Sequence, residues 1–224
     1  YTRIEAVYGD TLKLPHPDYN SLKYNILHGK TTNKRELGCY FSHIKALRAF
    51  MESGAKYALV LEDDIQLPNG LLNLIEQAIH YCDHWNLLRL TSFKPGEQLA
   101  FAKLDDQYAL SYNLKVLKNT GAYVIDRHAA QCILDRMLPM CLPYDVALDR
   151  NWRYGFKTAC ISPLPITLNM DLPGQIPAAK KIRFFRSISF HAFHLLTHIE
   201  RRISRRRDFK QATREQKCAQ SFQR

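Results

Sequence analysis

The chain has 224 residues, enough for one α/β domain with a sizeable core and an appendage. It holds no run of about 18 apolar residues and opens without a signal-peptide pattern, which favours a soluble body over a membrane-spanning or secreted one. Its 6 cysteines are scattered without a C-x-x-C pair. That spacing favours buried free thiols in a reducing compartment over a disulfide framework or a zinc site.

The positive charge lies almost entirely at one end of the chain. The formal net charge is +11, yet residues 1–179 hold 19 Lys and Arg against 18 Asp and Glu. Residues 180–224 hold 13 against 3. We therefore divide the chain into a near-neutral body, 1–179, and a basic tail, 180–224, with which the protein would meet any anionic surface.

The first part of the chain predicts little regular structure. Residues 1–10 alternate in part, which predicts a short strand ending in a turn. Residues 11–36 are polar and predict a loop of the kind that often contributes substrate contacts.

Helical spacing of apolar residues begins near Gly38 and predicts a helix that continues to Met51. Ser42 and His43 fall in its expected first turn, where backbone N–H groups attract anions. The alternative interpretation of His43 is a packed, hydrogen-bonded side chain.

A strand followed by three carboxylates is the central feature of the sequence. The apolar run 57–61 predicts a strand buried on both faces of a largely parallel sheet, and such sheets bind ligands beyond the carboxyl ends of their strands. Glu62, Asp63 and Asp64 follow directly, and three like charges there need a compensating cation. Oxygen ligands suit Mg²⁺ or Mn²⁺, which commonly hold substrate phosphates as well. A solvated acidic turn is the alternative.

The rest of the body predicts an alternation of strands and helices. We expect helices over 71–79 and 127–137, strands over 87–90, 119–125 and 157–162, and small antiparallel strands on the sheet edge within 94–118. Gly121 would let another group approach the backbone closely.

Two acids share the face of a further expected helix, 144–152. Asp145 has an N-cap-like position, and Asp149 follows four residues later. The ordinary explanation is a helix cap and an ion pair of Asp149 with Arg153. The functional explanation places an acid over the substrate.

The tail predicts a basic amphipathic helix. Its apolar stripe comprises Phe184, Ile188, Ala192, Leu195, Ile199 and Ile203. With cations at both ends, residues 180–207 are typical of an element that binds an anionic membrane surface. The alternative is that the stripe docks on the body and leaves the arginines solvated. Nucleic-acid binding is disfavoured, since the sequence shows no matching fold or base-stacking platform.

Four elements in this order resemble glycosyltransferase family 25, the lipooligosaccharide sugar transferases with their collagen galactosyltransferase relatives. They are Gly38-Cys39-x-x-Ser42-His43, Leu61-Glu62-Asp63-Asp64, Gly121-Ala122-Tyr123-Val124-Ile125, and Pro143-x-Asp145 with Asp149. The resemblance covers roughly residues 4–165 and implies an α/β catalytic domain, 1–179, with a GT-A-like nucleotide-sugar-binding sandwich. Such families open with a strand that helps to bind the nucleotide base, and we expect this sequence to begin after that strand.

The resemblance also implies roles for individual residues. Asp64 would bind Mn²⁺ or Mg²⁺ with Glu62, the latter nearer the ribose, while the nucleotide-sugar site would include Glu62, Asp63, His43, Ser42 and Gly121. A divalent cation neutralises charge on the leaving diphosphate, and inversion needs a base at the acceptor hydroxyl. Asp145 is the first candidate base and Asp149 the second. Lys118 and Arg89 could add positive contacts or be exposed charges at strand ends.

The expected function is therefore metal-dependent, inverting transfer of galactose or glucose from a UDP-sugar. The acceptor would be a lipid-linked oligosaccharide, the core of lipooligosaccharide or lipopolysaccharide, at the cytoplasmic face of a bacterial inner membrane. Two alternatives stay open. One is a metal-dependent phosphohydrolase, and the other is a non-enzymatic membrane- or nucleic-acid-binding protein with a degenerate site.

Overall fold

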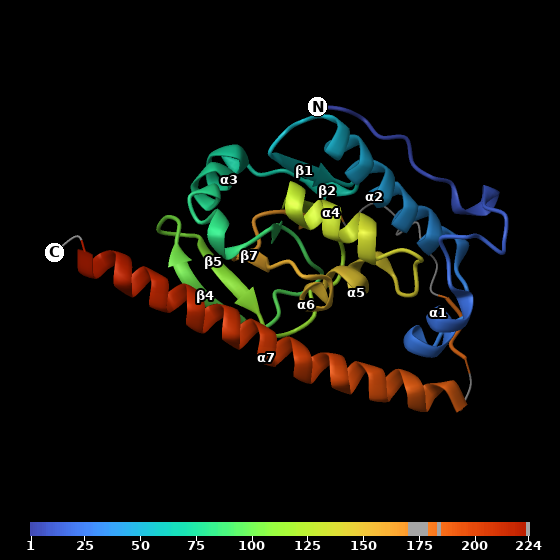
Figure 1. The fold of residues 1–224 in the computed structure, drawn as a ribbon. Coiled ribbons are helices and arrows are strands. Elements are labelled where there is room, and N and C mark those ends of the chain that lie inside the picture. The colour runs from blue at the N-terminus through green and yellow to red at the C-terminus, as the bar shows by residue number, and fades with distance from the viewer. Residues whose placement is uncertain (170–178, 183–184, 223–224) are drawn as a thin grey trace.

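The computed structural model describes residues 1–169, 179–182 and 185–222 (Figure 1). The helices are α1 (Ser21–His28), α2 (Lys34–Glu52), α3 (Leu71–Ile79), α4 (Arg127–Arg136), α5 (Tyr144–Leu148), α6 (Asn151–Tyr154) and α7 (Phe185–Phe222), with short 3-10 turns at Gly9–Thr11 and Cys82–His84. The strands are β1 (Tyr57–Leu61), β2 (Ile65–Gln66), β3 (Leu87–Arg89), β4 (Gln98–Lys103), β5 (Ala109–Asn113), β6 (Ala122–Asp126), β7 (Thr158–Ser162) and β8 (Thr167–Leu168).

The central sheet is mixed, not largely parallel. Its strand order is β1-β6-β3-β7-β5-β4, and β3 with β7 forms the one parallel pair among the described strands. β2 and β8 form a separate two-stranded sheet. The expectation of a doubly buried β1 was wrong, because β1 is an edge strand that pairs antiparallel with β6 alone and keeps its residues partly exposed. This pairing sets the carboxyl end of β1 against the start of β6.

Both faces of the sheet are covered, as an α/β sandwich requires. Side chains of β6 alternate between the two sides: Tyr123 and Ile125 pack in a cluster with α2 and α4, while Ala122 and Val124 pack in a second cluster with α3. Figure 1 shows α2 and α4 side by side over β1, with α3 at the other end of the molecule. The mixed α/β class is confirmed, and the predicted edge hairpin is β4 and β5.

The first part of the chain differs from the sequence predictions. Residues 1–8 form no strand, and α1 lies within the predicted loop, because Asn20 caps its start and Gly29 ends it in a left-handed conformation. The predicted helix near Gly38 starts earlier, at Lys34, where Asn33 accepts a hydrogen bond from the Arg35 N–H group. His43 and Ser42 therefore lie well inside α2, and the helix-terminus argument for anion binding does not apply to them.

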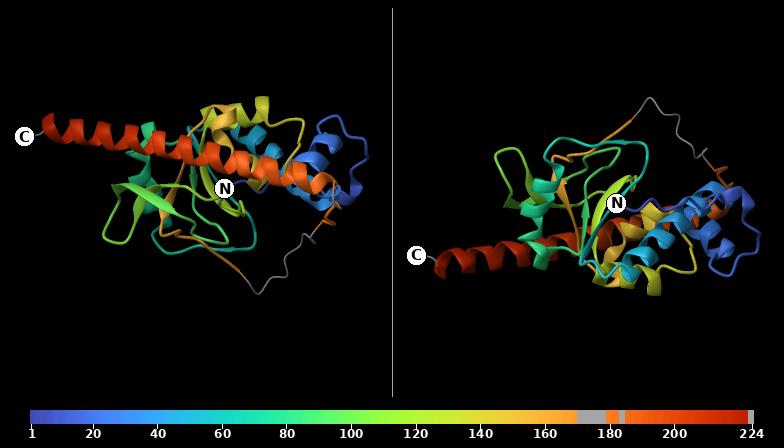
Figure 2. Two further views of the ribbon diagram at one scale, coloured as in Figure 1. Left: turned by 90° about the horizontal axis from the view of Figure 1, so that it is seen from below. Right: turned by 90° about the horizontal axis from the view of Figure 1, so that it is seen from above.

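Helix α7 lies along the body, as the views of Figures 1 and 2 show. The residues that it buries are mostly polar or charged: Thr197, Arg201, Ser204, Arg205, Asp208 and Ala212. The apolar stripe faces outward, with Ile188 67%, Leu195 63%, Ile199 48% and Ile203 65% exposed. The alternative in which this stripe docks on the body was wrong. Phe184, the first residue of the predicted stripe, lies outside the described residues. Within the described residues, no helix is both long and apolar enough to cross a bilayer.

Candidate active site

The loop that precedes β6 brings a hydroxyl group to the acidic end of β1. The Glu62 N–H group donates to the carbonyl oxygen of Gly121 at 2.7 Å. Asn119 adopts a positive φ of 79°, and its side-chain oxygen accepts from the Gly121 N–H group at 2.6 Å. This turn directs Thr120 toward Glu62, and its hydroxyl donates to the Glu62 carboxylate at 3.0 Å.

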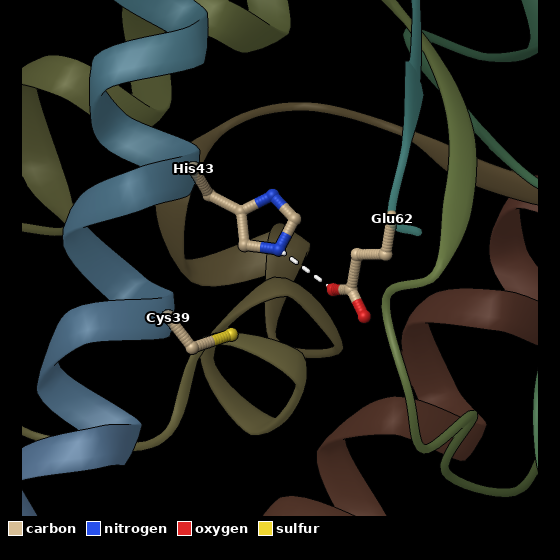
Figure 3. A group of neighbouring side chains, drawn as sticks. All are labelled: Cys39, His43 and Glu62. Carbon is tan, nitrogen blue, oxygen red and sulfur yellow. Dashed lines mark hydrogen bonds and ion pairs between the residues drawn. The ribbon is translucent and has the colours of Figure 1, made fainter. Parts of the chain in front are cut away.

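His43 reaches the same carboxylate from α2. Its Nε2 lies 3.0 Å from Glu62 Oε1 and 3.3 Å from the Thr120 hydroxyl. Figure 3 shows His43 and Cys39, one helical turn apart, both directed toward Glu62. The three groups come from α2 and from the end of β1, so the packing of α2 over the sheet edge builds this cluster.

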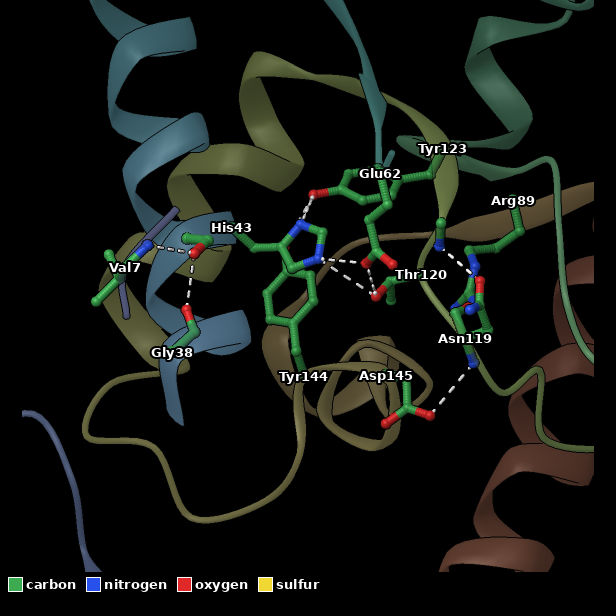
Figure 4. Close-up of polar contacts among 12 residues, drawn as sticks. Val7, Gly38, His43, Glu62, Arg89, Asn119, Thr120, Tyr123, Tyr144 and Asp145 are labelled. Carbon is green, nitrogen blue, oxygen red and sulfur yellow. Dashed lines mark hydrogen bonds and ion pairs between the residues drawn. The ribbon is translucent and has the colours of Figure 1, made fainter. Parts of the chain in front are cut away.

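Two tyrosines fix the orientation of the His43 ring (Figure 4). Its Nδ1 lies 3.1 Å from the Tyr123 hydroxyl, and the Tyr144 ring stacks on it with centroids 4.2 Å apart. The two tyrosine hydroxyls are themselves 3.2 Å apart. His43 is 5% exposed, so Nε2 is aimed at the carboxylate by neighbours that leave the ring little freedom.

Glu62 and Asp64, which both follow β1, have opposite pKa shifts. Burial acts to raise the pKa of Glu62, but the hydrogen bonds from His43 and Thr120 outweigh it and lower that pKa. Burial and the charges of Glu62 and Asp63 raise the pKa of Asp64. Glu62 is thus stabilised as a carboxylate by protein groups, while Asp64 is not.

Asp64 has the property expected of an oxygen ligand to a cation. Its Oδ1 is buried and has no hydrogen-bond partner within the described part of the chain. Buried polar atoms are nearly always paired, so an orphaned carboxylate oxygen next to two more acids fits a hard divalent ion. Asp63 is exposed beside it. The residues present therefore suit the Mg²⁺ or Mn²⁺ that the sequence predicts.

Asp145 faces the same region from the first turn of α5. Its Oδ2 accepts from the Asn119 N–H group at 3.3 Å, and Oδ1 accepts from the Val146 N–H group at 2.8 Å. The helix cap predicted for Asp145 was wrong, since Pro143 occupies the N-cap position. Asp145 is partly exposed, so its carboxylate can be reached from solvent.

The sequence model described as glycosyltransferase family 25 (LPS biosynthesis protein) matches residues 1–148, which include every group described above. The chain belongs to glycosyltransferase family 25. Comparison with curated proteins gives no further match. The enzyme is thus a glycosyltransferase of lipopolysaccharide biosynthesis, and neither the phosphohydrolase nor the non-enzymatic alternative fits that membership.

Two predicted site residues of the family 25 enzyme, Ser42 and Gly121, contact other parts of the protein. The Ser42 hydroxyl donates to the Gly38 carbonyl at 2.8 Å and accepts from the Val7 N–H group at 2.8 Å, which fastens the N-terminal segment to α2. A Cβ atom on Gly121 would lie 2.9 Å from the Asn119 side chain and 3.0 Å from Ile65. The close approach predicted at Gly121 is therefore that of the protein's own side chains.

The structure separates Asp149 from Asp145. Asp149 is 4% exposed and pairs with Arg201 of α7 at 2.5 Å, so the predicted pair with Arg153 was wrong. Arg153 pairs with Glu200 instead. Burial raises the pKa of Asp149, and the guanidinium group of Arg201 opposes that rise. Of the two candidate bases, Asp145 is therefore the more exposed.

Arg89 and Lys118, the two basic side chains predicted to add positive contacts, differ in their exposure. Arg89 is 1% exposed and donates to the backbone carbonyls of Leu117 and Asn119. It holds the loop before β6 in place and is neither an exposed charge nor a diphosphate contact. Lys118 is exposed in that loop. A positive contact from Lys118 to the diphosphate therefore stays a prediction.

Sequence reasoning missed the hydroxyl and thiol groups of this site. Thr120, Tyr123 and Tyr144 contact His43 or Glu62, and Cys39 lies beside them. Tyr123 occurs in a strand where an aromatic residue is ordinary, and Tyr144 is far from His43 in the chain. The one available signal was the four-residue spacing of Cys39 and His43, which places both on one helix face.

Proposed function

We propose that this enzyme transfers a hexose, galactose or glucose, from a UDP-sugar to the core of lipooligosaccharide or lipopolysaccharide, with inversion at the transferred carbon. The observation that supports it most is the unpartnered, buried Oδ1 of Asp64 at the end of β1. In a family 25 glycosyltransferase, this is where a cation and a diphosphate would be held together.

The acidic end of β1 would bind the donor through a divalent ion. Asp64 would be a direct ligand of Mn²⁺ or Mg²⁺, with Glu62 as the second carboxylate or as a ribose contact, and Asp63 at the exposed rim. When bound, such an ion neutralises the charge that develops on the leaving diphosphate. His43 and Thr120 hold Glu62 ionised and oriented for either role.

Asp145 would act as the base. Inverting transfer requires one group to remove the acceptor proton as the new bond forms, and a carboxylate can do so within hydrogen-bond distance. The Asn119 and Val146 N–H groups fix both Asp145 oxygens without neutralising the carboxylate. The acceptor hydroxyl would therefore approach along α5, on the side of the loop before β6.

Transfer assays with a panel of UDP-hexoses and a lipid-linked acceptor test this proposal. Asp64→Asn should lower kcat/KM by about 10²–10³, the typical loss when one electrostatic contact to the transition state is removed. Glu76→Gln, an exposed acid on α3, is the matched control and should behave as wild type. Full turnover by a folded Asp64→Asn variant would contradict the proposal.

We further propose that the outward face of α7 rests on an anionic membrane, at the cytoplasmic side of a bacterial inner membrane. Its exposed apolar residues, Ile188, Leu195, Leu196, Ile199 and Ile203, are followed on the same side by exposed cations, Arg206, Arg207, Lys210, Arg214 and Lys217. Apolar insertion combined with cation attraction, about 1 kcal/mol for each charge, supports reversible attachment. The lipid-linked acceptor would then lie at the surface on which the enzyme sits.

A further inference from the structure

Cys39, His43 and Glu62 form a cluster whose donor types differ from those of a hard-cation site. One atom from each residue, the thiol sulfur, a ring nitrogen and a carboxylate oxygen, lies within 4.8 Å of the other two. Cys39 and His43 are one turn apart on α2, and Glu62 follows β1 directly. Figure 3 shows the sulfur directed into the space between His43 and Glu62.

The donor set suits a borderline-soft ion. Sulfur and imidazole ligands select Zn²⁺ or Co²⁺ over Mg²⁺ and Mn²⁺, which prefer oxygen alone. Tetrahedral bonds of about 2.0–2.3 Å place neighbouring donor atoms roughly 3.3–3.8 Å apart. Donor atoms within 4.8 Å of one another need to approach by at most roughly 1–1.5 Å to reach that separation.

The outer contacts of such a site already exist. Metal-binding histidines usually have a hydrogen-bond partner on the second ring nitrogen, and here Tyr123 lies 3.1 Å from Nδ1. The Thr120 hydroxyl holds the Glu62 carboxylate, and the Tyr144 ring fixes the plane of the imidazole. His43 is 5% exposed, while Cys39 and Glu62 are partly exposed, so an ion has both a shielded position and a path to it.

We propose that Cys39, His43 and Glu62 bind one Zn²⁺-class ion, with a fourth position open to water or to a ligand. Binding replaces the hydrogen bond between His43 Nε2 and Glu62: the Nε2 proton is lost and Nδ1 carries the ring proton, while the thiol proton of Cys39 passes to solvent. His43 then binds through Nε2 and donates from Nδ1 to the Tyr123 hydroxyl. Glu62 is shared with the proposed hard-cation site, so the two ions would compete for one carboxylate.

This site has no C-x-x-C spacing, which is why the sequence argued against zinc. Its ligands come from a four-residue helical spacing and from a strand end that only the fold brings together. The proposal does not depend on transferase activity, so it can fail while the proposed function stands, and the reverse is also true.

Titration of the metal-free full chain with Co²⁺ tests the site, because a thiolate bound to Co²⁺ gives a charge-transfer absorption band in the near ultraviolet. We expect a band that saturates at one Co²⁺ per chain and disappears on addition of Zn²⁺. Cys39→Ser should abolish it, while Cys82→Ser, which removes another partly exposed thiol, should keep it. A band that persists in Cys39→Ser, or no band in the wild type, would overturn the proposal.

The Tyr123→Phe variant distinguishes binding of the ion through His43 from binding by the Cys39 thiol alone. Loss of the partner of Nδ1 should weaken Co²⁺ binding about 10-fold while the band itself remains, as removal of outer contacts does in metal sites. Circular dichroism and thermal melting of each variant show that it is folded. Unchanged affinity in folded Tyr123→Phe would contradict binding through His43.

Discussion

Two carboxylates of this enzyme, Glu62 and Asp149, each lie close to a basic side chain but differ in what surrounds them. Glu62 is held by His43 at 3.0 Å, and next to it stands Asp64 with an unpaired buried oxygen. Asp149 forms an ion pair with Arg201 of α7 at 2.5 Å and is buried beneath that helix. A close ion pair therefore does not mark a functional site by itself. Glu62 differs from Asp149 in that it stays partly exposed beside Asp64, whereas Asp149 is 4% exposed.

Asp145 in α5 and Asp149 directly after it make the same contrast only four residues apart. Asp145 is partly exposed beside the loop before β6, whereas Asp149 is 4% exposed and anchors α7 with Arg201. The residues around Glu62, Asp64 and Asp145 should therefore control turnover. The pair of Asp149 with Arg201 should control stability. Each of the following predictions tests that division.

The largest expected effect is on turnover in Asp145→Asn. Loss of the base should lower kcat by about 10²–10⁴ with little change in the urea midpoint of unfolding. Asp149→Asn should do the opposite, with a lower midpoint and a kcat close to that of wild type in the folded protein. If Asp149→Asn lost turnover while Asp145→Asn kept it, the assignment of the base would be reversed.

Next in size is the stability loss in Arg201→Met. This change leaves buried Asp149 without its hydrogen-bonded partner, which should lower the free energy of unfolding by roughly 3–5 kcal/mol in urea titrations. Arg206→Met, on the exposed side of the same helix, serves as the control and should stay within about 0.5 kcal/mol of wild type. Equal stabilities for the two variants would show that α7 is not anchored by its charged face.

A smaller effect is expected at the outward face of α7. Ile203→Glu should weaken binding to vesicles that contain anionic phospholipid by about tenfold to a hundredfold, because burial of one large apolar side chain is worth about 1.5–3 kcal/mol. Leu72→Glu, on α3, is a matched control, since Leu72 is 67% exposed and Ile203 65%. Similar vesicle binding by both variants would argue against α7 as the membrane-facing element.

The smallest expected effect is on the pH dependence of stability. The pKa of Glu62 is lowered in the folded protein, so its contribution is present above its unfolded pKa and is lost as pH falls through the folded value. The stability difference between wild type and Glu62→Gln should therefore narrow as pH falls below 4.5, the ordinary pKa of a glutamate side chain. A constant difference in urea titrations would show that His43 and Thr120 do not favour the ionised form.

Local patterns predicted the elements whose apolar residues are continuous or periodic. The helix at 71–79 and the strands at β3, β6 and β7 follow such runs. Local patterns failed to predict α1. Its sequence is polar because only a few of its side chains, such as Tyr24 and His28, are buried. Local patterns also placed the start of α2 too late, since Asn33 as its cap lies outside the apolar pattern.

The orientation of α7 could not be predicted from its own sequence. An apolar stripe opposite cations normally faces a core, but here the arginines have a partner in Asp149, which is distant along the chain. Only part of the candidate site could be predicted from the sequence, because some of its residues also depend on partners that are distant along the chain. Glu62, Asp64 and His43 belong to local motifs, whereas Thr120, Tyr123 and Tyr144 join them only through the packing of α2 over β6.

Calorimetric titration with UDP, with and without Mn²⁺, tests the central claim most directly. The account predicts that wild-type enzyme binds UDP much more tightly when Mn²⁺ is present, and that Asp64→Asn loses this metal-dependent gain while remaining folded. Equal UDP affinity with and without Mn²⁺, or an unchanged gain in Asp64→Asn, would contradict a metal-bridged diphosphate at the end of β1.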